Sequence, residues 1–147
     1  MTEPAPFRFN LARYCLAENA RLRAGKTAMI LVGAESEVRM SFAEADLAVR
    51  RLAAGLQSLG LPPQSRIMIR MANDADYALT YYATMAAGYV ALPSSAQLTP
   101  NEAAYLLENS GAAAVAASAQ LAADLTLPTG VLLLDPVKLQ ALKQFAP

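Results

Sequence analysis

Apolar residues in this sequence form short runs, several of them unbroken, separated by longer segments of mixed polarity. The runs occupy residues 27–32, 38–40, 67–71, 89–92, 113–117 and 131–134. Runs of this length are typical of β-strands, and strands without polar alternation are usually buried on both faces. The first two runs are separated by Gly-Ala-Glu-Ser-Glu, a segment of suitable length for a hairpin loop. They are therefore predicted to form a β-hairpin.

The segments between these runs carry helix start signals. Ser41-Phe42-Ala43-Glu44 and Thr99-Pro100-Asn101-Glu102 place a hydroxyl residue three positions before a glutamate, which is the pattern of a capping box. Asn10, Asn73-Asp74 and Asp135-Pro136 offer single side-chain caps. Helices are therefore predicted at 10–23, 42–59, 74–88, 119–124 and 137–145, and from Thr99 onward.

Three of these helices differ in their polar faces. The helix at 42–59 has one apolar stripe, made by Phe42, Ala45, Val49, Leu52, Leu56 and Leu59. Asp46 and Arg50 are expected to form a weak ion pair on its exposed face. In the helix at 10–23, the spacing places Leu11, Cys15 and Leu22 on one face. The helix at 74–88 carries no charge beyond Asp76, so it is predicted to lie between layers or under another part of the protein.

The alternation of strands and helices predicts an α/β fold with a mainly parallel sheet and helices on both faces. The run at 67–71, the helix at 74–88 and the run at 89–92 form a strand–helix–strand unit, which normally joins parallel neighbours. Residues 1–9, with Pro4 and Pro6, are predicted to be a flexible tail. Residues 10–147 are predicted to form the α/β domain.

Composition narrows the classes of function. The chain has 147 residues, a net charge of +0, 55% hydrophobic residues and no histidine. The balanced charge argues against nucleic acid as a partner, and the missing histidine excludes Ser-His-Asp and Cys-His nucleophile systems. No apolar run reaches the length of a membrane span, and the N-terminus has no signal-peptide core. A single cysteine permits no internal disulfide, so we expect a cytoplasmic protein.

Candidate chemistry is sparse. Neither common glycine-rich phosphate loop occurs, nor does a nucleophile elbow or a C-x-x-C pair. Asn73, Asp74 and Asp76 are explained by helix capping better than by a metal site, and no metal site is expected. Arg50 and Arg51 are interpreted as a solvated helix face rather than a phosphate patch. Tyr81 and Tyr82 are interpreted as packing residues rather than the wall of an aromatic pocket.

Three further residues are candidates for functional roles. Cys15 is interpreted as a small core residue, because the sequence shows no electropositive surroundings that would activate a thiol. Ser94 and Ser95 follow a strand end, where open α/β sheets bind ligands. A plain polar loop explains these serines better than ligand contacts do.

The order of several short motifs resembles the early part of the adenylate-forming superfamily, which includes acyl- and aryl-CoA synthetases, nonribosomal adenylation domains and luciferases. The pieces that carry this resemblance are Ser41–Leu61, Gln64-Ser65-Arg66-Ile67, Asn73, Ala87-Gly88, Pro93 and Leu98-Thr99-Pro100-Asn101-Glu102. Ser65 stands where the family usually has aspartate. The segments FNLARYCLAENA and SSAQLT resemble benzoate-like and medium-chain acid–CoA ligases slightly more than other members of the superfamily.

The resemblance implies that the chain is the first part of the large N-terminal domain of an adenylate-forming enzyme, so that residues 10–147 are an incomplete domain. Such enzymes use ATP and Mg to convert a small carboxylic acid to an acyl-adenylate, and the CoA synthetases then form acyl-CoA. The family's catalytic motifs would lie beyond Pro147, so no catalytic residue is expected here and the chain alone is predicted to be inactive. Gln97 matches a position where some CoA ligases place a basic residue against the CoA nucleotide.

Two alternatives remain open at this stage. The chain could be a free-standing, non-catalytic α/β binding or scaffolding module, or a small α/β enzyme of another kind. If the ligase interpretation holds, the principal partner is the remainder of the ligase chain. The fully apolar helix at 74–88 then predicts an exposed apolar face and self-association of the isolated chain.

Overall fold

The computed structural model describes residues 9–33 and 36–147. The predicted tail, except for Phe9, and Ala34 and Glu35 of the predicted hairpin loop lie outside these ranges. In chain order the elements are η1 (Arg13–Ala17), α1 (Glu18–Arg23), β1 (Thr27–Val32), β2 (Glu37–Ser41), α2 (Phe42–Gln57), β3 (Arg66–Arg70), α3 (Ala75–Ala86), β4 (Val90–Pro93), α4 (Pro100–Ser110), β5 (Ala114–Ala117), α5 (Ala119–Ala123), β6 (Leu132–Leu134) and α6 (Pro136–Leu142).

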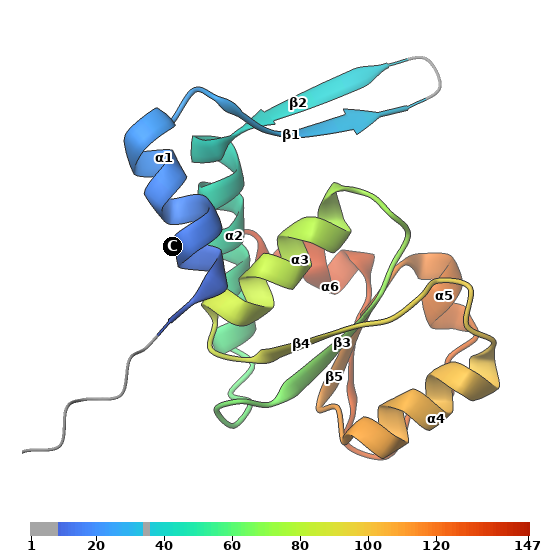
Figure 1. Ribbon diagram of the computed structural model, residues 1–147. Coiled ribbons are helices and arrows are strands. Elements are labelled where there is room, and N and C mark those ends of the chain that lie inside the picture. Colours follow the sequence, from blue (N-terminus) through green and yellow to red (C-terminus); the bar gives the residue numbers. More distant parts are fainter. Residues whose placement is uncertain (1–8, 34–35) are drawn as a thin grey trace, which may run out of the picture.

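Four strands form a parallel sheet in the order β4-β3-β5-β6 (Figure 1). Central strands β3 and β5 are in register from Ile67 opposite Ala114 to Arg70 opposite Ala117. The strand–helix–strand unit predicted from the sequence is present, with β3 and β4 as parallel neighbours. The predicted α/β class with a mainly parallel sheet is therefore confirmed.

Helices cover both faces of this sheet. On one face, Ile67, Ile69, Ala114 and Ala116 share a core with residues of α2, α3 and α6. On the other face, Met68, Val115 and Ala117 pack against α4 and the residues that follow α5. All seven strand residues are 0% exposed. Alternate side chains of the central strands thus serve two separate cores, as expected for strands buried on both sides.

The first two strands form a separate antiparallel hairpin that projects from the α/β body (Figure 1). Its base is held by backbone hydrogen bonds from Phe42 N to Lys26 O (2.9 Å) and from Ala43 N to Ala24 O (3.0 Å). Ile30, Val32 and Val38 on its strands are exposed. The predicted pairing of the first two apolar runs is confirmed, and part of its apolar surface faces solvent.

Helix α3 is enclosed as the sequence predicted. None of its residues is exposed, and it contacts α2, β3 and β4. Asp74 caps its start by accepting a hydrogen bond from Tyr77 N (3.0 Å), and Gly88 follows its end with φ +84°. Asp76 in its first turn pairs with Lys143 beyond α6 at 2.7 Å. The helix therefore lies between the sheet and the outer helices.

The N-terminal helix departs from the predicted α periodicity. Asn10 caps it as predicted, accepting from Arg13 N at 3.1 Å, but residues Arg13–Ala17 form a π-helix. A π-turn holds more residues than an α-turn and rotates the following side chains about the axis. The buried positions are Ala12 and Leu16, and the prediction for Leu22 was wrong because its residue is 62% exposed.

Two details of the α-helices also differ from the predictions. Asp46 does not lie on an exposed face, because its residue is only 9% exposed beside η1 and α3. Its 2.8 Å ion pair with Arg50 is present as predicted. Helix α6 ends at Leu142 rather than at residue 145.

Helices α2 and α6 approach closely at Gly55. A Cβ atom at this position would lie 2.8 Å from both Cα and Cβ of Leu142, and it would also overlap the carbonyl oxygen of that residue. Because backbone cannot move aside as a flexible side-chain end can, the contact requires glycine. This explains a glycine in the interior of a helix, where it otherwise weakens the fold.

We predict that Gly55→Ala lowers the free energy of unfolding by about 1–3 kcal/mol, since overpacking outweighs the gain in helix propensity. Urea unfolding followed by circular dichroism measures the change. Gly25→Ala is the matched control, because a Cβ there meets nothing within 4 Å. Equal stability of the Gly55 and Gly25 variants would contradict the close α2–α6 contact.

Candidate functional site

The carboxyl edge of the parallel sheet is the best placed region for a ligand. Helix α3 follows β3 on one face of the sheet, whereas α5 follows β5 on the other. The connections thus diverge between two neighbouring strands, and open α/β sheets bind ligands in the crevice at such a point. The segments that follow β3, β4 and β5 form this edge.

The segment between β4 and α4 is held by hydrogen bonds to β3 and within the segment itself. Ser94 donates to Ile69 O from both its backbone N (3.0 Å) and its Oγ (3.1 Å). Ser95 Oγ accepts from Gln97 N at 3.1 Å. Both serines that were candidates for ligand contacts therefore already bind backbone groups, which favours the structural interpretation of this loop.

The capping box predicted at the start of α4 is present. Thr99 Oγ1 accepts from Glu102 N at 3.3 Å, and Thr99 N donates to Glu102 Oε2 at 2.8 Å. The backbone hydrogen bond from Thr99, and then that from its hydroxyl, lower the pKa of Glu102. Stability from this carboxylate is therefore present above its unfolded pKa and is lost as the pH falls through its lowered folded pKa. Ser41 and Glu44 form the same arrangement at α2.

Gln97, the candidate CoA contact, is exposed at this edge. Its backbone is fixed by Ser95, whereas its side-chain amide makes no hydrogen bond to residues 9–33 or 36–147. The amide can donate and accept hydrogen bonds but cannot neutralise a phosphate. Gln97 thus presents a side-chain amide that is not committed to a hydrogen bond within the described residues.

Arg70, which the sequence analysis did not single out, connects this loop to the opposite side of the crevice. Its side chain is 2% exposed and donates from Nη2 to Leu98 O and from Nη1 to Leu121 O, both at 2.7 Å. Leu98 directly follows Gln97, and Leu121 lies in α5. Within the described residues, no carboxylate lies within ion-pair distance and Nε has no hydrogen-bond partner. The sequence feature that could have identified Arg70 is the presence of an arginine at the end of an otherwise apolar strand.

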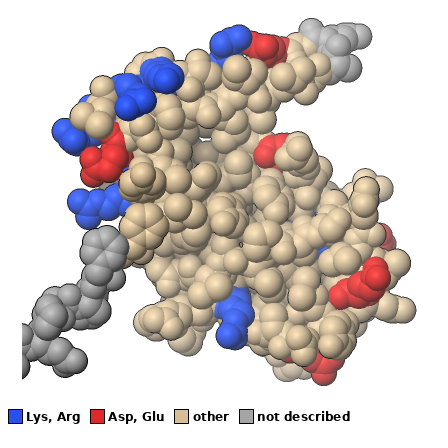
Figure 2. All heavy atoms as spheres, viewed as in Figure 1, with Lys and Arg blue, Asp and Glu red and all other residues tan. Residues whose placement is uncertain are grey.

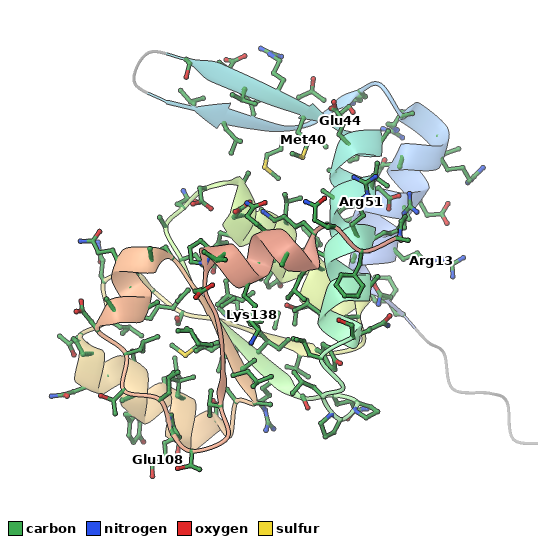
Figure 3. The ribbon with its side chains drawn as sticks, turned by 180° about the vertical axis from the view of Figure 1, so that it is seen from behind. Arg13, Met40, Glu44, Arg51, Glu108 and Lys138 are labelled. Carbon is green, nitrogen blue, oxygen red and sulfur yellow. The ribbon has the colours of Figure 1, made fainter. Side chains whose placement is uncertain are left out.

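The other candidate residues have structural roles. Asp74 is a cap and Asp76 an ion-pair partner, and the described part of the chain contains no cluster of three or more His, Cys, Asp or Glu side chains suited to a metal. Arg51 is exposed on α2 (Figure 3), while Arg50 pairs with Asp46. Neither arginine belongs to the edge described above.

Two aromatic side chains of α3 and the cysteine also pack in the core. The Tyr81 and Tyr82 rings meet edge to face with centroids 5.5 Å apart. Burial, followed by the neighbouring Cys15, raises the pKa of Tyr82. Cys15 is half-buried among core residues. The structure therefore favours packing roles for all three.

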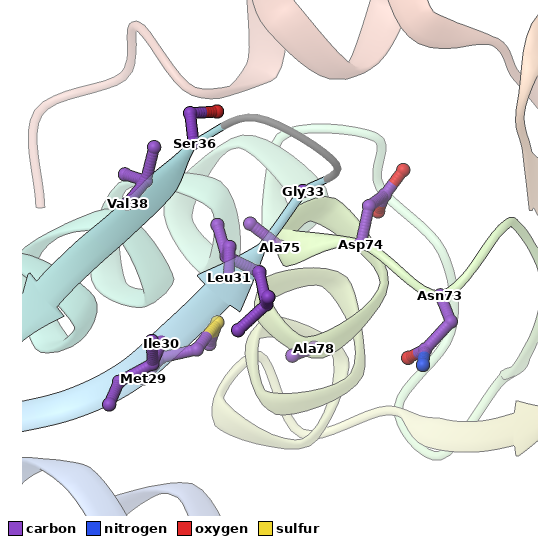
Figure 4. Close-up of a pocket in the computed structure, with 11 residues that line it drawn as sticks. Met29, Ile30, Leu31, Gly33, Ser36, Val38, Asn73, Asp74, Ala75 and Ala78 are labelled. Atoms are coloured by element: carbon purple, nitrogen blue, oxygen red, sulfur yellow. The ribbon is translucent and has the colours of Figure 1, made fainter.

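A mainly apolar cleft lies elsewhere, between the hairpin and the start of α3 (Figure 4), and Figure 2 shows the surface hollowed beneath the hairpin. Its volume is about 650 Å³. The lining residues are mainly apolar, namely Met29, Ile30, Leu31, Val32, Gly33, Ser36, Val38, Asn73, Asp74, Ala75 and Ala78. The polar side chains of this lining are those of Ser36, Asn73 and Asp74.

Comparison with known proteins places the chain in a family. The family model described as AMP-binding enzyme matches residues 16–145. Rice (Oryza sativa subsp. japonica) 4-coumarate–CoA ligase 5 is 34% identical over 88 residues, covering 60% of this chain and 16% of the relative. The long-chain-fatty-acid–CoA ligase FadD13 of Mycobacterium tuberculosis is 29% identical over 80 residues, covering 54% and 16%.

Solved structures agree with the family match. The benzoate CoA ligase of Burkholderia xenovorans LB400 superposes with a TM-score of 0.82 at 28% identity, covering 95% of this chain and 29% of that one. The N-terminal domain of FACL13 from Mycobacterium tuberculosis gives 0.81 at 23% identity, covering 95% and 37%, which supports the fold alone.

The fold and its carboxyl edge define an open α/β domain of the kind that binds ligands beside parallel strands. The chain belongs to the AMP-binding enzyme family and corresponds to an N-terminal portion of adenylate-forming acyl- and aryl-CoA ligases. It spans 16% of the length of the first curated relatives. The predicted resemblance and the predicted α/β fold class are confirmed.

We predict that Arg70→Ala destabilises the protein by about 2–4 kcal/mol, because two carbonyl hydrogen bonds are lost and a buried cavity remains. The loop that carries Gln97 should lose hydrogen-exchange protection before the rest of the sheet does. Arg66→Ala is the control, since Arg66 is exposed and donates one hydrogen bond, to Ser110 O at 3.0 Å. Unchanged protection of residues 95–99 would show that Arg70 does not hold this loop.

Proposed function

We propose that this chain is the N-terminal part of an AMP-forming acid–CoA ligase. In the complete enzyme, a carboxylate oxygen attacks the α-phosphate of ATP to give acyl-adenylate and pyrophosphate. The thiol of CoA then attacks the acyl carbon, releasing AMP and forming acyl-CoA. The match of the family model to residues 16–145 is the observation that carries this proposal. The substrate is a small carboxylic acid, as the likeness to a benzoate CoA ligase suggests.

In this proposal the described residues build and position one wall of the enzyme, and the remainder of the ligase chain supplies the catalytic groups. ATP and Mg would be held there, since the carboxyl edge offers no cluster of carboxylates and no glycine-rich phosphate loop. Arg70 fixes the loop between β4 and α4, and Gln97 presents an uncommitted amide from it. This amide would hydrogen-bond to the nucleotide of CoA.

We also propose a cytoplasmic location for the enzyme. The single cysteine suits a reducing compartment. In residues 9–33 and 36–147, no helix combines the length and apolar character needed to cross a bilayer.

The reading frame after the codon for Pro147 tests the ligase proposal directly. We expect it to encode a Ser/Thr/Gly-rich loop that ends in Pro-Lys, and the 147-residue chain alone should show no ATP–pyrophosphate exchange with any of a panel of carboxylic acids. A stop codon directly after Pro147 would contradict the ligase proposal. Measurable exchange by the purified 147-residue chain would instead contradict its predicted inactivity.

In the complete ligase, we predict that Gln97→Ala raises the KM for CoA by about 2–10-fold, the value of one or two neutral hydrogen bonds. The rate of ATP–pyrophosphate exchange, which does not involve CoA, should stay the same. Gln97→Arg should lower the KM, because a guanidinium can pair with a phosphate. Gln140→Ala, on the exposed surface of α6 and away from this edge, is the control. Equal KM values for all four proteins would remove Gln97 from the CoA site.

A further inference from the structure

Strand β2 forms the outer edge of the hairpin. Within the described residues this edge pairs with no other strand, and its charged side chains are complementary to themselves. Strand β2 is on the side of the hairpin away from α3, and β1 lies between them (Figure 1). Within the described residues, β2 pairs only with β1. An exposed strand edge of this kind can pair with another strand, and natural proteins usually protect such edges.

Hydrogen-bonded and non-hydrogen-bonded residue pairs alternate along the hairpin. This alternation identifies the residues whose backbone N–H and C=O groups face the outer edge of β2. Gly33 N donates to Ser36 O at 2.8 Å, so these two residues form a hydrogen-bonded pair. Antiparallel pairs alternate, which makes Leu31–Val38 a hydrogen-bonded pair and leaves Val32–Glu37 and Ile30–Arg39 without mutual hydrogen bonds. The N–H and C=O groups of Glu37 and Arg39 therefore point outward from β2.

These two residues are complementary to themselves under a two-fold rotation. If a second β2 pairs antiparallel about Val38, Glu37 lies opposite Arg39 of the other copy, and Arg39 lies opposite its Glu37. Both cross-strand pairs have outward N–H and C=O groups, so each can form two backbone hydrogen bonds. Glu37 and Arg39 already lie on one face, with Arg39 Nε 2.6 Å from Glu37 Oε1, so the dimer would join four charges in alternation.

The apolar side chains support the same arrangement. Met29, Leu31, Val38 and Met40 share the face of the hairpin opposite to the charges, as their cross-strand pairing shows. Val38 is 55% exposed in the single chain. Two-fold pairing would bring the Val38 side chains of the two copies together and would extend this apolar face across a four-stranded sheet.

We propose that the outer edge of β2 is a dimerisation surface on which a second copy of this chain adds its own β2. The interface is isologous, because each copy contributes the same residues. Opposite charges set the register at Val38, since a shift by one residue would lose both ion pairs. This proposal rests on the hairpin alone and does not depend on the ligase function.

Charge reversal tests the proposal in the 147-residue protein. The wild-type chain should reach twice its 15.6 kDa mass in light scattering as its concentration rises. Glu37→Arg and Arg39→Glu should each weaken dimerisation by about tenfold or more, because like charges then face each other. An equimolar mixture of these two variants should dimerise again, and so should the double variant Glu37→Arg/Arg39→Glu.

Glu108→Arg is the control, since it reverses an exposed charge on α4, far from Met40 and the hairpin (Figure 3). It should dimerise like the wild type. Circular dichroism of each variant confirms that the fold is intact. A wild-type chain that stays monomeric, or a dimer that the single reversals leave unchanged, would overturn the proposal. The second result would assign association to another surface, such as the apolar cleft under the hairpin.

Discussion

The burial of β3 and β5 on both faces is the constraint on which the rest of this structure depends. Parallel strands cannot be joined by tight turns, so each connection must cross the sheet and cover one of its faces. The small side chains of β5 allow helices to approach closely on both sides. The two cores that result account for most of the fully buried apolar residues in the described chain.

This constraint extends outward to the next layer. Helix α3 covers one face of the sheet but is itself apolar all round, so α2 must cover it from outside. Helix α6 then packs beside α2, at a distance that only glycine permits at position 55. The hairpin is the exception, because it touches the body mainly at its base and leaves apolar side chains exposed.

Most of the fold could be predicted from the sequence because its signals are local. A capping side chain marks the start of a helix at Ser41, Asp74 and Thr99, and each apolar run marks a strand. Each of these signals identifies its helix or strand independently of the rest of the chain. The π-helical turn at Arg13–Ala17 could not be predicted in this way, since no local residue pattern marks it, and it packs against α2. The burial of Asp46 likewise depends on a neighbouring helix that contributes nothing to the local pattern.

The candidate site was less predictable for a related reason. Gln97 was identified only through a family resemblance, whereas the importance of Arg70 depends on two carbonyl groups that lie 28 and 51 residues away along the chain. A buried guanidinium without a carboxylate is costly unless its donors are used, and here two backbone oxygens accept one hydrogen bond each from Nη1 and Nη2.

Those oxygens belong to the β4–α4 loop and to α5. Arg70 therefore ties both segments to the end of the buried strand β3. The carboxyl edge of the sheet is thus coupled to the packing of the core through one buried side chain.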